Sequence, residues 1–159
     1  MLQQELLQTL AEMAATIAVL STVAGVVSRK ALSPVSKSLL RDVAVMGLLV
    51  ALFCLLPLIF WNDQSMATLR LCAFGAALIW LLAYCFYLRD VYRDQIQMTV
   101  LFWIGMVTTF LGLGLLFACV LTDDGVNITL YLVGMLSWLA IAGLNFVASV
   151  FDRPKAEHY

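Results

Sequence analysis

The chain runs from residue 98 to residue 121 without a charged side chain, as MTVLFWIGMVTTFLGLGLLFACVL. A helix needs about 20 predominantly apolar residues to cross the hydrocarbon core of a bilayer, so this run predicts a transmembrane helix. Uncharged runs at 43–61 and 128–151 predict two more, and the slightly shorter run at 71–88 predicts a fourth. We therefore expect an all-α, polytopic membrane protein with at least four membrane-spanning helices.

The composition of the whole chain agrees with a membrane location. Its 159 residues are 64% hydrophobic and 12% charged, with a mean hydropathy of +0.99, whereas a soluble domain is about 45 to 50% apolar and about 25% charged. The length allows a single transmembrane domain over 1–159, nearly all of it spans and short connections. We expect no nucleic-acid binding, because there is no basic surface, and no enzyme activity, because there is no room for a soluble catalytic domain.

The N-terminal segment is the ambiguous one. The uncharged stretch 13–28 is short for a span, and a helix over about 6–28 is long enough only if it carries Glu12 near its outer end. Small side chains recur along one face at the spacing that lets two helices approach closely in lipid: Ala11, Ala15, Ala18, Thr22 and Gly25. We expect this helix to be a fifth span that packs through this face; the alternative is four spans and a peripheral helix.

Basic residues indicate the orientation of the chain, since cytoplasmic loops carry an excess of Lys and Arg. The connection 29–41, the pair Arg89 and Arg93, and the tail 152–159 hold every basic residue except Arg70. These three regions lie on one side of the membrane if the spans alternate in direction. The pattern predicts a short cytoplasmic C-terminal tail and is typical of the bacterial inner membrane.

Side chains that hold metals or carry out catalysis are scarce. The only histidine is His158, and four cysteines lie within the spans at no metal-ligand spacing: Cys54, Cys72, Cys85 and Cys119. The cysteines are therefore interpreted as small buried apolar residues. We expect no cofactor, no metal site and no catalytic centre.

Two residues inside the spans predict local geometry. Pro57 has no backbone N–H, so it should bend its helix and leave the carbonyl of Phe53, four residues back, without its helical partner. Tyr131 lies near the start of the last span, where we expect it to join the aromatic belt at the outer membrane interface.

Weakly polar residues are the remaining candidates for a site. Thr108 and Thr109 lie near the middle of one span, while Ser137, Asn145 and Ser149 share one face of the last. Interhelical hydrogen bonds, worth about 0.6 kcal/mol each on average, are the simplest role for such groups. The alternative is a pore lining, formed when several identical chains surround an axis.

Two carboxylates precede the last span. Asp123 and Asp124 form a short outer turn, with Asn127 expected to cap the helix that follows. In a ring of identical chains the same carboxylates would gather cations at the outer mouth of a pore.

Three stretches resemble small multi-pass bacterial inner-membrane proteins, a likeness that covers most of the chain and implies no activity: LLQTLAE at 6–12, FCLLPL at 53–58 and AGLNFV at 142–147.

Three functions stay open. The first is a homo-oligomeric assembly in the lipid bilayer that forms a small pore or acts as a membrane effector. The second is a non-conducting interaction protein, such as an immunity, exclusion or assembly factor, that docks a membrane-protein partner. The third is a small-molecule or lipid carrier, ranked last because the four uncharged spans lack charged coordinating groups.

Overall fold

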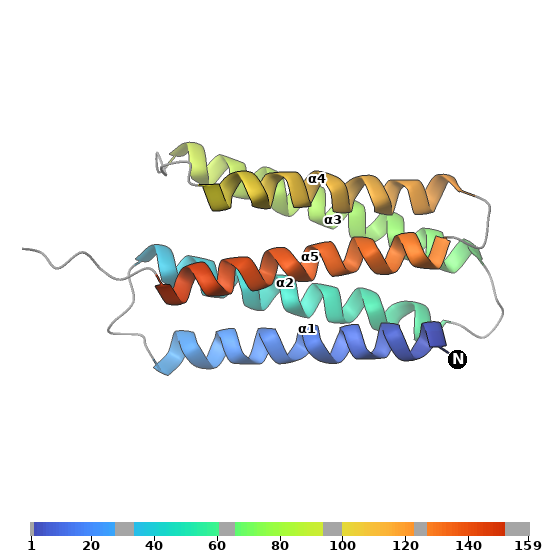
Figure 1. The fold of residues 1–159 in the computed structure, drawn as a ribbon, viewed down its shortest axis with the longest axis horizontal. Helices are drawn as coiled ribbons and strands as arrows, with labels where there is room; N and C mark the ends of the chain where they lie inside the picture. Colours follow the sequence, from blue (N-terminus) through green and yellow to red (C-terminus); the bar gives the residue numbers. More distant parts are fainter. Residues whose placement is uncertain (1, 28–33, 61–65, 94–99, 123–126, 152–159) are drawn as a thin grey trace, which may run out of the picture.

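Five long helices make up nearly all of the part of the chain that this computed structural model describes, namely residues 2–27, 34–60, 66–93, 100–122 and 127–151. The helices are α1 (Leu2–Val27), α2 (Pro34–Ile59), α3 (Met66–Arg93), α4 (Val100–Leu121) and α5 (Asn127–Phe151). They run along one common axis (Figure 1), and each is long and apolar enough to cross a membrane. The prediction of an all-α polytopic protein is confirmed, and the N-terminal helix is the fifth such helix.

The helices extend beyond the uncharged runs that predicted them. α2 begins at Pro34 rather than near residue 43, and α3 continues to Arg93, past its apolar segment Ala67–Phe86. A proline is well tolerated in the first turn of a helix, where its missing N–H would have had no partner. Charged residues do not end a helix that has already left the hydrocarbon, so the uncharged run measures the span and not the helix.

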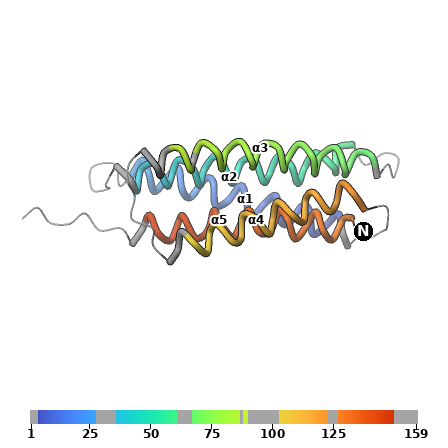
Figure 2. The backbone as a smooth tube through the Cα atoms, turned by 90° about the horizontal axis from the view of Figure 1, so that it is seen from above, coloured from blue at the N-terminus to red at the C-terminus, as the bar shows by residue number. Residues whose placement is uncertain are grey.

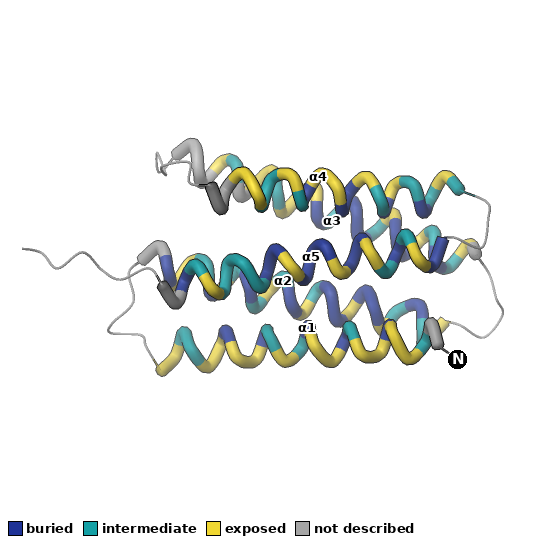
Figure 3. Tube along the Cα trace, viewed as in Figure 1, coloured by how far each residue is buried: buried dark blue, intermediate teal, exposed yellow. Residues whose placement is uncertain are grey.

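The helices pack in a chain of neighbours around α5. α1 packs along α2, α2 packs on α5, α5 packs on α4, and α3 packs chiefly on α4. Seen from above, α3 lies on one side of the bundle and α4 and α5 on the other (Figure 2). Buried residues line the facing sides of the helices, and exposed residues line the outer sides (Figure 3). The fold is thus a single bundle whose outer surface is the one that lipid or another protein would contact.

α1 and α2 approach each other almost backbone to backbone. A Cβ atom placed on Gly47 would lie 2.7 Å from the Ala14 carbonyl oxygen and 3.0 Å from the Ala18 Cβ. The buried residues of α1 that form this seam are Leu7, Ala11, Ala14, Ala18 and Ser21. The predicted small-residue face is therefore correct at Ala11 and Ala18.

The predicted face is displaced by one residue at two positions. Ala15 is only half-buried and Thr22 is exposed, while Ala14 and Ser21 occupy the seam. Gly25 is half-buried and faces Leu40 of α2, so the prediction is also correct there. Alternate spacings of three and four residues keep Leu7, Ala11, Ala14, Ala18 and Ser21 on one stripe of the helix. Because the seam is already filled by α2 of the same chain, it is not available to a second copy.

The indole rings of Trp80 and Trp138 join α3 to α5. They stack with their centroids 4.7 Å apart and their planes 13° from parallel, and both residues are buried. Gly112 of α4 makes room for this pair, since a Cβ there would lie 2.3 Å from the Trp80 ring. The absence of a side chain at Gly112 thus leaves the space on α4 that the Trp80 ring occupies.

Tyr131 ties α5 to α2 at the point where the proline interrupts the helix. Its hydroxyl donates a hydrogen bond of 2.5 Å to the carbonyl oxygen of Phe53. This carbonyl is the one left without a helical partner by Pro57, which lies inside α2, so the prediction of a free Phe53 acceptor is confirmed. The side chain of Tyr131 is fully buried between the helices and does not face the surroundings of the bundle, because its donor group is satisfied inside; its depth relative to the membrane interface stays a prediction.

Candidate functional site

The hydroxyl groups predicted to line a pore or bridge helices bond within their own helices. Each donates to a carbonyl three or four residues back, at 2.7 to 2.9 Å: Thr108 to Ile104, Thr109 to Gly105, Ser137 to Val133 and Ser149 to Phe146. Thr109, Ser137 and Ser149 are buried, and Thr108 and Asn145 are half-buried. Each of these four hydroxyls therefore donates its proton to the backbone of its own helix and not to a neighbouring helix.

The segment that precedes α5 is described only in part. Asp123 and Asp124, the candidate outer-mouth carboxylates, lie outside the described residues. Beside them, the carbonyl oxygen of Thr122 accepts hydrogen bonds from the Arg70 guanidinium at 2.7 Å and from the Asn127 side-chain amide at 2.8 Å. These bonds join α3, α4 and α5 at one end of the bundle.

The expected capping bond of Asn127 is not formed. Its side-chain oxygen is buried without a hydrogen-bond partner in the described part of the chain. The side chain instead uses its amide to close the turn back onto Thr122. The prediction of a side-chain cap at this position is therefore wrong.

Three of the four cysteines gather from three helices around one hydroxyl. Cys54, Cys72 and Cys119 are buried, free thiols on α2, α3 and α4, in the neighbourhood of Tyr131. Cys119 also donates to the backbone carbonyl of Asn127 at 3.2 Å. Cys85 is exposed, so the interpretation of all four as buried residues is wrong for this one. Among the described residues, no three His, Cys, Asp or Glu side chains meet as a metal site.

Polar side chains cover the outward face of the first half of α1. The members of this α1 polar face, spaced three or four residues apart and all exposed, are Glu5, Gln8, Thr9, Glu12 and Thr16. The Gln8 side-chain amide donates to a carboxylate oxygen of Glu12 at 3.0 Å. The two threonine hydroxyls donate to carbonyls four residues back in α1. In the described structure these groups bond only to one another and to their own backbone, because the face points away from the bundle (Figure 3).

The depth of Glu12 follows first from the register between α1 and α2. Ala14 and Ala18 face Gly47, and Gly25 faces Leu40, so the two antiparallel helices place Glu12 level with about residue 51. That residue lies near the middle of the uncharged run 43–61. Glu12 is also only about 5 Å, at 1.5 Å per residue, from the middle of its own apolar segment Gln4–Val27.

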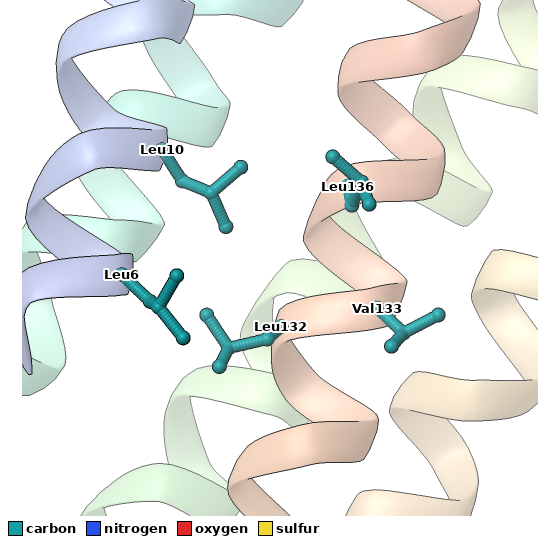
Figure 4. Close-up of a pocket in the computed structure, with 5 residues that line it drawn as sticks. All are labelled: Leu6, Leu10, Leu132, Val133 and Leu136. Carbon is teal, nitrogen blue, oxygen red and sulfur yellow. The ribbon is translucent and has the colours of Figure 1, made fainter. Parts of the chain in front are cut away.

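The register between α1 and α5 gives the same depth. A groove of about 200 Å³ between these helices is lined only by apolar side chains, namely Leu6, Leu10, Leu132, Val133 and Leu136. Leu6 lies beside Leu132 and Leu10 lies level with Leu136 (Figure 4). The next two residues along each helix put Glu12 level with Trp138, at the middle of the apolar segment Asn127–Ser149.

Glu12 therefore lies near the middle of the bundle's length, ten residues after the start of α1, which is further from the outer end than the sequence suggested; its depth in a membrane stays a prediction. The sequence suggested the outer end because the uncharged stretch begins only after Glu12. In the structure α1 begins at Leu2 and pairs with α2 from its first turns, since Leu7 is already fully buried. The carboxylate then faces outward at a depth where the other helices present only apolar side chains to the surroundings.

The five helices define the class of the chain, which is a multi-pass membrane protein. No protein-family model matches the chain, and comparisons with curated proteins and with solved structures find no match either.

Proposed function

We propose that this protein is a membrane interaction protein that binds another membrane protein, inside the bilayer, through the α1 polar face. It acts without conducting ions, as an immunity, exclusion or assembly factor does. The proposed location is a bacterial inner membrane with the C-terminal tail in the cytoplasm, which the distribution of basic residues favours. This orientation is supported by the helix directions, which bring Lys37 and Arg41 of α2 to the same end of the bundle as Arg89 of α3.

The observation that carries the proposal is the position of Glu12, which is exposed and lies near the middle of the apolar helix bundle. Inserting a charged residue at the centre of a membrane helix costs on the order of 2.5 to 3.5 kcal/mol on insertion scales. Gln8 supplies one hydrogen bond, but a carboxylate offers about four acceptor positions. Lipid tails have no hydrogen-bond donors for the remaining acceptor positions of the carboxylate. A protein surface that supplies such donors would therefore stabilise the α1 polar face.

Two further observations favour binding over conduction. The hydroxyls of Thr108, Thr109, Ser137 and Ser149 are already bonded within their helices. The small-residue seam of α1 is filled by α2 of the same chain, which removes one reason to expect a ring of identical subunits. The homo-oligomeric pore and the carrier stay predictions that rest on the sequence pattern.

Site-specific photo-crosslinking of the full-length protein in its native membrane tests this function. A photoreactive residue at Thr9 or Thr16 lies on the α1 polar face, while the same residue at Leu71 or Val107 lies on exposed apolar surfaces of α3 and α4. We expect one discrete partner to crosslink from the first two positions only. We also expect Glu12→Leu to abolish that product and purified protein to show no ion flux.

Two results would reject the proposal. One is a crosslink pattern that is the same from Leu71 and Val107 as from Thr9 and Thr16, which would mean that α1 carries no specific surface. The other is a product made only of two copies of this chain, which would return the homo-oligomer to first place.

A further inference from the structure

We infer that the partner on the α1 polar face is a transmembrane helix of another protein that carries a lysine or arginine near the middle of the bilayer. The inference rests on the proposed function and deepens it, because it assigns the chemistry of the partner. The inference starts from the position of one acidic side chain. Glu12 lies on an outward face of the bundle near the middle of its length, and the described cationic side chains lie elsewhere.

The chain does not neutralise this face itself. α1 contains Glu5 and Glu12 and no basic residue. The register with α2 puts Arg41 about 15 Å along the axis from Glu12, toward the end of the bundle where α2 begins. Arg70 lies at the end of the bundle where α4 ends, and it donates a hydrogen bond to the Thr122 carbonyl there. Among the described residues, no cationic side chain lies at the depth of Glu12.

Lipid headgroups lie too far away to take the place of a protein cation. The hydrocarbon core is about 30 Å thick, so a residue about 5 Å from its centre is about 10 Å from the nearer headgroup layer and about 20 Å from the other. The glutamate side chain is too short to reach that far, unlike the longer lysine and arginine side chains that extend toward the interface. The compensating charge must therefore come from within the membrane.

A second copy of this chain is the wrong occupant on grounds of charge. Two copies inserted in the same direction and related by an axis normal to the membrane would set Glu12 against Glu12 and Glu5 against Glu5. Like charges that face each other across an interface disfavour association. A helix with a central Lys or Arg instead forms a charge-assisted hydrogen bond to the carboxylate, and Gln8 already holds that carboxylate in place.

The geometry of the face also suits a helix. Its members follow one stripe of α1 over about three turns, and Thr9 and Thr16 flank Glu12 with small side chains. Small and hydroxylated residues let a second backbone approach closely in lipid. A basic side chain from that helix can then reach Glu12 between the two threonines.

The test uses full-length protein in liposomes and synthetic polyleucine transmembrane peptides with one central residue changed, with association measured by fluorescence transfer. We expect the peptides with central Lys or Arg to bind at least about tenfold more tightly than the peptide with central Leu. Glu12→Gln, which keeps the shape and the amide hydrogen bonds but removes the charge, should abolish this difference. Lys37→Gln, which removes an exposed charge on α2 outside the α1 polar face, is the control and should retain it.

Each other outcome overturns the inference. Equal binding of the central-Lys and central-Leu peptides, or full binding by Glu12→Gln, would show that charge does not select the partner. Self-association of labelled protein that is lost in Glu12→Leu would identify a second copy as the occupant. If the crosslinks from Thr9 and Thr16 to another protein persist while the basic peptides fail, the interaction function stands and only the assigned chemistry is wrong.

Folding does not confound these variants. Glu12 is exposed and bonds only to Gln8 of the same helix and, through its backbone, to Thr16. Replacing it with Gln or Leu therefore removes no contact between helices, and the helical content and thermal unfolding of the variants should match those of the parent protein.

Discussion

The two halves of the bundle use glycine in opposite ways. Between α1 and α2, Gly47 lets two backbones touch, with a distance of only 2.7 Å from the position of its absent Cβ to the Ala14 carbonyl oxygen. Among α3, α4 and α5, Gly112 instead makes room for the large ring of Trp80, which stacks on Trp138. One joint is built from the smallest side chains and the other from the largest.

This difference determines what each joint can tolerate. The atoms that face Gly47 belong to the backbone and to Ala18, so nothing can move aside unless the helices separate. The atoms that face Gly112 belong mainly to a side chain, which has rotamers to change, although its stacking on Trp138 opposes the change. A close contact between backbones should therefore be the less forgiving of the two.

The largest effect is expected from Gly47→Ala. The new methyl group would overlap the Ala14 carbonyl and press on Ala18, which forces α1 away from α2 along the whole seam. We expect the free energy of unfolding to fall by about 3 kcal/mol, at the upper end of the range for overpacked cores. Titration of the protein with SDS in bicelles, followed by circular dichroism, measures this loss.

Gly114→Ala is the matched control on another helix. Nothing lies within 4 Å of the position of the new Cβ, so the free energy of unfolding should be unchanged or rise by up to about 1 kcal/mol through helix propensity. Equal losses in the two variants would mean that the α1–α2 contact is not close in the membrane.

A smaller loss, about 2 kcal/mol, is expected from Gly112→Ala. The Cβ would lie 2.3 and 2.7 Å from two atoms of the Trp80 ring, so the ring must tilt away from Trp138. The same SDS titration measures the change.

Trp80→Phe sharpens this prediction, because the shorter ring leaves space for the methyl group. In a double-mutant cycle it should recover at least about 1 kcal/mol of the Gly112→Ala loss, whereas with Gly47→Ala the two losses should simply add. Recovery of Gly47→Ala by Trp80→Phe would contradict the view that the two joints are independent.

Features that depend on neighbours along the chain could be predicted from the sequence. The apolar runs located all five helices, and Pro57 identified the Phe53 carbonyl as an unused acceptor. The sequence predicted that small residues of α1 pack against another helix, but it did not predict which small residues face that helix. Ala14 stands beside Ala15, and Ser21 beside Thr22, so the composition cannot tell which member of each pair faces α2.

The depth of Glu12 could not be predicted in the same way. It depends on how far α1 slides along α2, and that register is set by the contact of Gly47 with Ala14 and Ala18, which lie two and six residues beyond Glu12. The donor for the Phe53 carbonyl was likewise out of reach, because Tyr131 is on a different helix. The candidate surface on α1 thus appears only when the helices are packed together.

The smallest effect is expected from Tyr131→Phe, which tests the link between the two halves. The change removes only the hydroxyl that donates to the Phe53 carbonyl. We expect a loss of about 1 kcal/mol, between the average of about 0.6 and the maximum of about 1.7 kcal/mol measured for hydrogen bonds between membrane helices. The loss should exceed the average because Pro57 leaves the carbonyl without another donor.

Pro57→Ala decides whether that reason is correct. The alanine N–H can donate to the Phe53 carbonyl as in an ordinary helix, so in the Pro57→Ala background Tyr131→Phe should cost less than about 0.5 kcal/mol. If the loss is the same with proline and with alanine, the tyrosine stabilises the bundle through its ring and not through its hydroxyl. In that case α2 and α5 are held by packing alone, as α1 and α2 are, and the contrast between the two halves becomes one of side-chain size only.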